Sequence, residues 1–158
     1  MPELSSIRRT LKSARQVGWR RRGLIVEAAA WLLITRLALL LVPFPRLARS
    51  LGAFVTPADP RVAQVAAPTT PEQADTARLV SWAVTRAAAH VPFRAVCLPQ
   101  AMAGRIMLKR RGVASAMHFG AGKGTDKPLD AHAWLDAAGV KVTGYPVGPQ
   151  FAEIACFV

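Results

Sequence analysis

The chain has 158 residues, 52% of them hydrophobic, which is enough for one domain with a sizeable core and excludes disorder over most of its length. Its formal net charge is +12, so an acidic or polyanionic partner has to be considered, while 7% aromatic residues and a single Tyr argue against a stacking platform for single-stranded nucleic acid. The two cysteines, Cys97 and Cys156, form no CxxC pair and no Cys/His cluster at zinc spacing. We therefore expect no structural metal and no disulfide scaffold, and the cysteine usage fits a reducing cytoplasm best.

Residues 1–55 are predicted to form a helical amino-terminal region. Ten basic residues lie among the first 50, against only Glu3 and Glu27, and those at 8, 9, 12, 15 and 20–22 recur at a spacing that gives one helix a basic face. We interpret this face either as solvated or as a surface for an acidic protein, an acidic peptide or anionic lipid. Nucleic-acid binding is not expected, because Trp19 is the only aromatic residue near the cluster.

The most apolar stretch, residues 24–42, is predicted to be a long helix that packs against the rest of the protein or against a partner. Glu27 and Arg36 interrupt it, and an ionised residue near the centre of a bilayer costs roughly 2.5–3.5 kcal/mol. Pro43 and Pro45 follow in place of the small-residue cleavage site of a secretory signal. Membrane association is therefore the less favoured alternative.

A proline-rich stretch at 56–70 is predicted to separate this region from a second unit at 70–158. Thr70 as N-cap and Pro71 at the first helical position begin a helix that should run to about Ala89. A second helix should begin at or beside Cys97 and end at Gly112, which suits a C-cap. Short strands are predicted at 113–119, 131–136 and 140–145, with a glycine-rich loop at 120–130 and a turn at 137–139. That loop lacks the ending of a phosphate-binding loop, so no cofactor is expected.

Cys97 and His132 are the residues with which this chain could perform covalent catalysis. A helix N-terminus stabilises a thiolate, an imidazole can take the thiol proton, and free backbone N–H groups can stabilise an oxyanion. Alternation along the predicted strand places His132, Trp134 and Asp136 on one face. Either residue alone is more often structural, but the two together favour a cysteine nucleophile with a histidine base.

The sequence offers two candidates for the group that would orient His132. A two-residue turn in the predicted hairpin places Tyr145 opposite His132 and Thr143 diagonal to it on the same face, and neither is an acid. Asp136 lies four residues along the strand, about 13 Å away, which is too far. The Thr143 hydroxyl, or Asp130 from the loop, is therefore the expected third member of the site.

Other polar residues receive a structural interpretation. His118 is expected to end a strand as a partly exposed residue, with a place near the substrate as the alternative. Gln100 is expected on the surface of its helix. Cys156 is interpreted as a buried apolar residue whose replacement by Ala leaves catalysis unchanged.

Three segments closely resemble the transglutaminase-like cysteine peptidases of lasso-peptide biosynthesis: Cys97-Leu98-Pro99-Gln100-Ala101, Lys109-Arg110-Arg111-Gly112-Val113 and Ala131-His132-Ala133-Trp134-Leu135. The resemblance implies an α+β, papain-like fold in which the nucleophilic Cys97 begins a helix packed on a small antiparallel sheet and His132 lies on the next strand. It also implies a function, removal of the leader from a ribosomally made precursor peptide. A separate ATP-dependent lasso cyclase then joins the new amino terminus to an acidic side chain. The family usually places an Asp on the strand after the histidine, and this sequence has no acid there.

Some members of that family carry a leader-recognition domain fused to the peptidase. Residues 1–50 are predicted to be helical and lack the strands of that domain, so the chain resembles the discrete form, which works with a separate leader-recognition protein. The amino-terminal region is then the expected docking surface for that protein or for the leader. Two other functions use the same sequence features, namely transglutaminase-type acyl transfer to an amine and a non-catalytic binding module anchored to a partner or a membrane.

Overall fold

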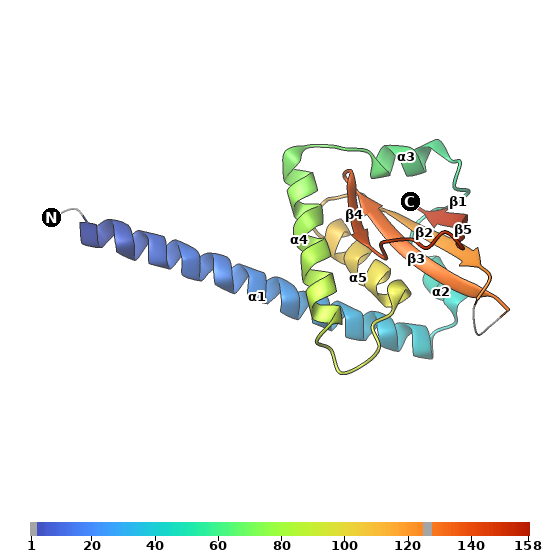
Figure 1. Cartoon of the computed structure of the whole chain (residues 1–158), viewed down its shortest axis with the longest axis horizontal. Coiled ribbons are helices and arrows are strands. Elements are labelled where there is room, and N and C mark those ends of the chain that lie inside the picture. The colour runs from blue at the N-terminus through green and yellow to red at the C-terminus, as the bar shows by residue number, and fades with distance from the viewer. Residues whose placement is uncertain (1–2, 125–127) are drawn as a thin grey trace.

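A five-stranded antiparallel sheet lies against helices that come mainly from the first two thirds of the chain (Figure 1). The computed structural model describes residues 3–124 and 128–158, with side chains from residue 18 onward. The strand order is β1-β5-β2-β3-β4, and each neighbouring pair is antiparallel. The elements are α1 (Glu3–Leu41), α2 (Phe44–Ala48), β1 (Phe54–Val55), α3 (Pro60–Ala66), α4 (Pro71–Ala88), α5 (Cys97–Lys109), β2 (Ala116–Gly122), β3 (Asp130–Ala137), β4 (Val140–Thr143) and β5 (Ala152–Phe157). The predicted α+β class, with the cysteine-bearing helix beside an antiparallel sheet and a helical amino-terminal extension, is confirmed.

The helix boundaries follow from local sequence chemistry. The Thr70 hydroxyl accepts a hydrogen bond from the backbone N–H of Gln73, and Pro71 opens α4 as predicted. Cys97 is the first residue of α5, and Gly112, with φ of 70°, supplies the left-handed residue that ends the turn after that helix. Both predicted helices are therefore confirmed.

Helix α1 packs on the domain along one face only. Ala28, Leu32 and Thr35 are buried against α4 and α5, whereas the amino-terminal half of the helix extends away from the rest of the protein (Figure 1). Within the described residues, Gly18–Leu41 is long and apolar enough to cross a membrane, a property it shares with core helices and signal sequences, and 17% of its most apolar window is buried. The basic face predicted around Arg8, Arg9, Lys12 and Arg15 lies outside the described side chains.

Glu27 fastens α1 to the end of α5. Its carboxylate accepts two hydrogen bonds from Arg111, at 2.5 and 3.1 Å, and lies 3.5 Å from the Arg110 guanidinium. These contacts, led by the hydrogen bond from Arg111, hold the pKa of Glu27 below its ordinary value near 4.5.

We expect Glu27→Gln to lower the free energy of unfolding at pH 7 by about 1 kcal/mol. A carboxylate with a lowered folded-state pKa stabilises the protein above its unfolded-state pKa and loses that contribution as the pH falls through the folded-state value. The difference between wild type and variant should therefore shrink on acidification below about pH 4.5. Urea unfolding of wild type and variant at pH 7 and at a pH below about 4.5 measures this difference. Asp75→Asn, which breaks the exposed Asp75–Arg78 pair, is the control and should cause no measurable change.

The two faces of the sheet carry different side chains. Met117, Leu135 and Phe157 face the main core with α5, where Gly104 allows close approach, because an added Cβ would lie 2.9 Å from Leu135 Cδ2. Ala116 and Cys156 share a second, smaller cluster with Val55 and Val62, the latter from α3. The sheet is therefore covered by α5 on one face and in part by α3 on the other.

Several predicted boundaries were wrong. The stretch 56–70, expected to be irregular, contains α3, which begins at Pro60 after Asp59 caps its first turn. Strand β2 spans Ala116–Gly122 and not 113–119, because the residues directly after Gly112 connect α5 to the sheet. Strand β4 ends at Thr143, two residues before the predicted end at 145. The division of the chain into units at 1–55 and 70–158 stays a prediction.

Candidate active site

Cys97 lies at the start of α5, where backbone donors are available. It is half-buried, its N-cap residue Val96 offers no side-chain cap, and the first turn contains no acidic residue. The backbone N–H groups of the first turn of an α-helix have no carbonyl partner within the helix, and Pro99 has no N–H group. The remaining donors and the positive end of the helix dipole favour negative charge at this point.

The imidazole of His132 has a defined orientation. Its Nε2 lies 2.6 Å from the carbonyl oxygen of Gly144, and the ring stacks on Trp134 and on Phe151 with centroid distances of 5.9 and 5.1 Å. A carbonyl oxygen only accepts hydrogen bonds, so Nε2 carries the hydrogen and the neutral ring has its lone pair on Nδ1. The arrangement leaves Nδ1 as the basic atom.

Helix α5 and strand β3 both begin toward the end of the domain that carries the β2–β3 connection (Figure 1). Cys97 and His132 are therefore at the same end of their elements. His132 shares its face of β3 with Trp134 and Asp136, whereas α5, which carries Cys97, packs on the other face of the sheet. In the part of the chain that the structure describes, no hydrogen bond joins the two side chains, and their pairing stays a prediction.

The predicted orienting groups lie elsewhere. The hairpin follows the expected register at Ala137↔Val140 and Asp136↔Lys141 but then shifts by one residue, so that Thr143 pairs with Leu135. A shift of one residue moves a side chain to the opposite face of the sheet.

Thr143 therefore faces α5, where its hydroxyl is buried without a hydrogen-bond partner among the described residues. The Asp130 carboxylate accepts a hydrogen bond from the backbone N–H of Ala131 instead. The Gly144 carbonyl takes the place at His132 that we expected Thr143 or Asp130 to fill. Sequence reasoning missed it because a backbone acceptor has no residue-type signal.

A different cysteine and histidine do contact each other. Cys156 Sγ lies 3.4 Å from His118 Nδ1, and the thiol donates a hydrogen bond to Glu153 at 2.8 Å. Burial, followed by that hydrogen bond and the nearby carboxylate charges, raises the pKa of the Cys156 thiol. Cys156 is fully buried in a strand and its thiol donates a hydrogen bond to Glu153, so it is unsuited to attack a peptide carbonyl. Cys97 remains the candidate nucleophile.

Two further expectations are corrected by burial. His118 is 6% exposed rather than partly exposed, because β3 and β5 flank it on both sides. Gln100 is half-buried and donates a hydrogen bond to the carbonyl of Ala95, which fixes the loop before α5.

Asp136 accepts a 2.6 Å hydrogen bond from the hydroxyl of Tyr145. These two side chains therefore bind each other and not His132.

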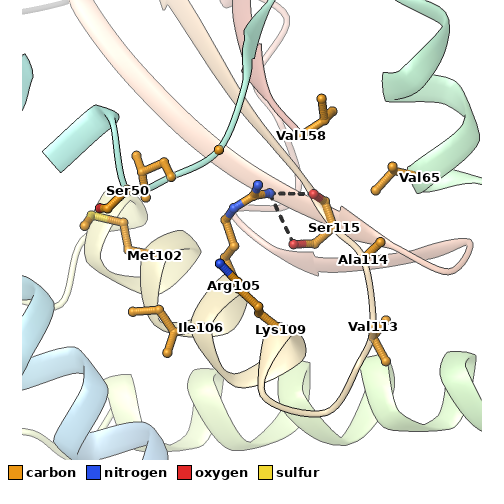
Figure 2. Close-up of a pocket in the computed structure, with 12 residues that line it drawn as sticks. Ser50, Val65, Met102, Arg105, Ile106, Lys109, Val113, Ala114, Ser115 and Val158 are labelled. Carbon is orange, nitrogen blue, oxygen red and sulfur yellow. Dashed lines mark hydrogen bonds between the residues drawn. The ribbon is translucent and has the colours of Figure 1, made fainter.

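A pocket of about 340 Å³ lies beside the later turns of α5, and Arg105 and Ser115 are among the residues that line it (Figure 2). Arg105 donates hydrogen bonds to the Ser115 and Phe157 carbonyls, which joins α5 to β2 and β5. Arg105 is eight residues after Cys97, about 12 Å along the helix axis. The pocket contains neither Cys97 nor His132 and is separate from the candidate site.

A comparison with protein-family models agrees with this fold. A family model described as the transglutaminase-like superfamily matches residues 38–156, which include both Cys97 and His132. No curated protein and no solved structure matches the chain. The superfamily includes cysteine proteases and acyltransferases, and the match covers well over half of the sequence. The chain belongs to the transglutaminase-like superfamily.

Proposed function

We propose that this protein is a cysteine endopeptidase that uses Cys97 as nucleophile and His132 as general base and acid. The observation that carries the proposal is the hydrogen bond that His132 Nε2 donates to the Gly144 carbonyl oxygen, because it fixes the tautomer whose Nδ1 can accept a thiol proton. The uncapped first turn of α5 supports it, since it offers Cys97 the donors that an oxyanion needs.

The reaction then follows the acyl-enzyme route. Cys97 transfers its proton to His132 Nδ1, and the thiolate adds to the scissile carbonyl carbon to give a tetrahedral oxyanion beside the N-terminus of α5. Collapse breaks the C–N bond, and His132 returns the proton to the leaving amine. Water, deprotonated by His132, attacks the thioester and releases a carboxylic acid and the free thiol. An amine in place of water would give transglutaminase-type acyl transfer from the same two residues.

The substrate we propose is a ribosomally made lasso-peptide precursor, cut between leader and core in the cytoplasm, after which a separate ATP-dependent cyclase uses the new amino terminus. The resemblance of the segments around Cys97 and His132 to the leader peptidases of that pathway supports it.

Helix α1 supplies a surface for a partner. Its exposed apolar residues, which we name the α1 apolar surface, are Val26, Leu33, Ile34, Leu37, Leu40 and Leu41. They lie away from the face that packs on α4 and α5, and contiguous exposed apolar side chains mark interaction sites. We propose that a separate leader-recognition protein docks here, because exposed Arg20, Arg21 and Arg22 on the same helix add positive charge for an acidic leader or partner.

Mass spectrometry of the precursor peptide, incubated with the purified protein and the leader-recognition protein, tests the function. Cleavage at one junction with gain of one water supports the peptidase, and an adduct with an added amine would instead show acyl transfer. An intact precursor would overturn the proposal and favour a non-catalytic binding module.

The double variant Leu37→Ser/Leu40→Ser should weaken binding of the leader-recognition protein at least about 10-fold, because centrally placed apolar side chains dominate interface energetics. Isothermal titration calorimetry measures the affinity. Ile154→Ser on β5, whose exposed apolar side chain belongs to the sheet and not to α1, is the matched control and should bind normally. Unchanged affinity of the double variant, together with its loss of flotation on anionic vesicles, would assign the α1 apolar surface to a membrane.

A further inference from the structure

The sheet face that lies away from α5 carries a cluster of four ligand-type side chains that the proposed reaction does not use. His118 comes from β2, Asp136 from β3, and Glu153 and Cys156 from β5. His118 and Cys156 are direct cross-strand partners, so the register of the central strands brings them together. The cluster is thus a product of the fold and joins three neighbouring strands.

Three atoms of this cluster converge on one point. His118 Nδ1 lies 2.5 Å from Glu153 Oε1 and 3.4 Å from Cys156 Sγ, and Cys156 Sγ lies 2.8 Å from Glu153 Oε1. Ligand atoms around a tetrahedral zinc ion are about 3.3–3.6 Å apart, given Zn–S near 2.3 Å and Zn–N and Zn–O near 2.0–2.2 Å. The nitrogen and sulfur already have this separation. Only the carboxylate has to move back by less than about 1 Å, and Glu153 is the member with solvent access, its side chain being 32% exposed.

The residues around His118 fix the orientation of its imidazole, as the neighbours of a metal-ligating histidine do. The His118 ring stacks on Trp134 at 5.4 Å with an interplanar angle of 1°, and the side chain is 7% exposed. Its second nitrogen, Nε2, is buried without a hydrogen bond among the described residues, yet lies 3.3 Å from Asp136 Oδ2. Asp136 is itself fixed by the Tyr145 hydroxyl. A carboxylate behind a ligating histidine selects the tautomer that leaves the other nitrogen free for the metal.

We propose that the protein binds one divalent zinc-type ion through His118 Nδ1, the Glu153 carboxylate and the Cys156 thiolate. The thiol gives up its proton to solvent on binding, and the thiolate and carboxylate then neutralise the two charges of the ion. A water molecule completes four coordination on the Glu153 side. The ion fastens β5 to β2, and the site is independent of the proposed peptidase activity.

This inference revises the expectation that the chain has no structural metal. The ligands are separated by 35 and 3 residues, which is not a recognisable zinc spacing. They meet only because β5 returns to lie beside β2.

Cobalt substitution tests the site without reference to activity. The Cys97→Ser protein, in which Cys156 is the only thiol, is freed of metal and titrated with Co²⁺. We expect one equivalent to bind, with a sulfur-to-cobalt charge-transfer band in the near ultraviolet and visible bands of tetrahedral intensity, all removed by Zn²⁺. Bound Zn²⁺ should also raise the Tm.

Variants assign the ligands. Cys156→Ala in the Cys97→Ser background should abolish the sulfur band, and the more exposed Glu153→Gln should weaken Co²⁺ binding while circular dichroism confirms the fold. Asp136→Asn should keep the band and weaken binding about 10–100-fold, as loss of an outer-shell partner does. The proposal is overturned if the Cys97→Ser protein shows no sulfur band at millimolar Co²⁺, or if the band survives in Cys156→Ala.

Discussion

Replacing Cys97 with Ala should reduce the rate of precursor cleavage by at least about 10³-fold, because no other described thiol can replace the nucleophile. Replacing His132 with Ala should reduce it by about 10²–10⁴-fold, since the thiol then has no base and the leaving amine no acid. Both rates are measured by mass spectrometry under single-turnover conditions, which separate chemistry from product release.

The control for this pair is Cys156→Ala. Cys156 is fully buried and its thiol donates a hydrogen bond to Glu153. Removing this thiol should therefore leave the cleavage rate within about 2-fold of wild type when the variant is folded. Iodoacetamide gives a second readout. It should modify Cys97 in the wild type and Cys156 only after unfolding, and His132→Ala should slow the modification of Cys97 at neutral pH. Full cleavage by Cys97→Ala, or alkylation of Cys97 that does not depend on His132, would contradict the assignment.

The parts of the fold that the sequence predicted are those governed by local chemistry. Thr70 and Pro71 opened one helix, Cys97 opened another, and Gly112 closed it, because caps and positive-φ glycines are determined by neighbouring residues. The hairpin turn after β3 was placed correctly for the same reason, since Ala138 and Gly139 both adopt positive φ there.

The parts that could not be predicted depend on contacts between distant segments. A one-residue shift between Leu135 and Asp136 moved Thr143 to the face of α5 and left the Gly144 carbonyl beside His132. Such a bulge has no composition signal in this hairpin. The burial of His118 likewise follows from the return of β5 beside β2, which pairs residues 31 to 40 positions apart in the sequence.

Gly144 combines a left-handed backbone conformation with a carbonyl that accepts a hydrogen bond from His132. Gly144→Ala should therefore strongly reduce both the stability and the cleavage rate. Gly144 has φ of 82°, and an added Cβ would collide with the Ala133 carbonyl and lie 2.8 Å from Trp134 Cα. These neighbours are backbone atoms of β3 and cannot move aside independently. We expect the free energy of unfolding to fall by about 2–4 kcal/mol, from left-handed strain and the displaced strand.

The same displacement moves the carbonyl that orients His132, so a catalytic effect should accompany the loss of stability. Among molecules kept folded at low temperature, cleavage should slow by about 10–10²-fold, the cost of a catalytic group misplaced by about 1 Å. Gly112→Ala is the matched control. Its φ of 70° imposes similar backbone strain, but an added Cβ there meets no atom within 4 Å. Gly112→Ala should therefore lose only about 1 kcal/mol and keep the wild-type rate. If both variants slow cleavage equally, or if Gly144→Ala cleaves at the wild-type rate, the Gly144 carbonyl does not orient the imidazole during the reaction.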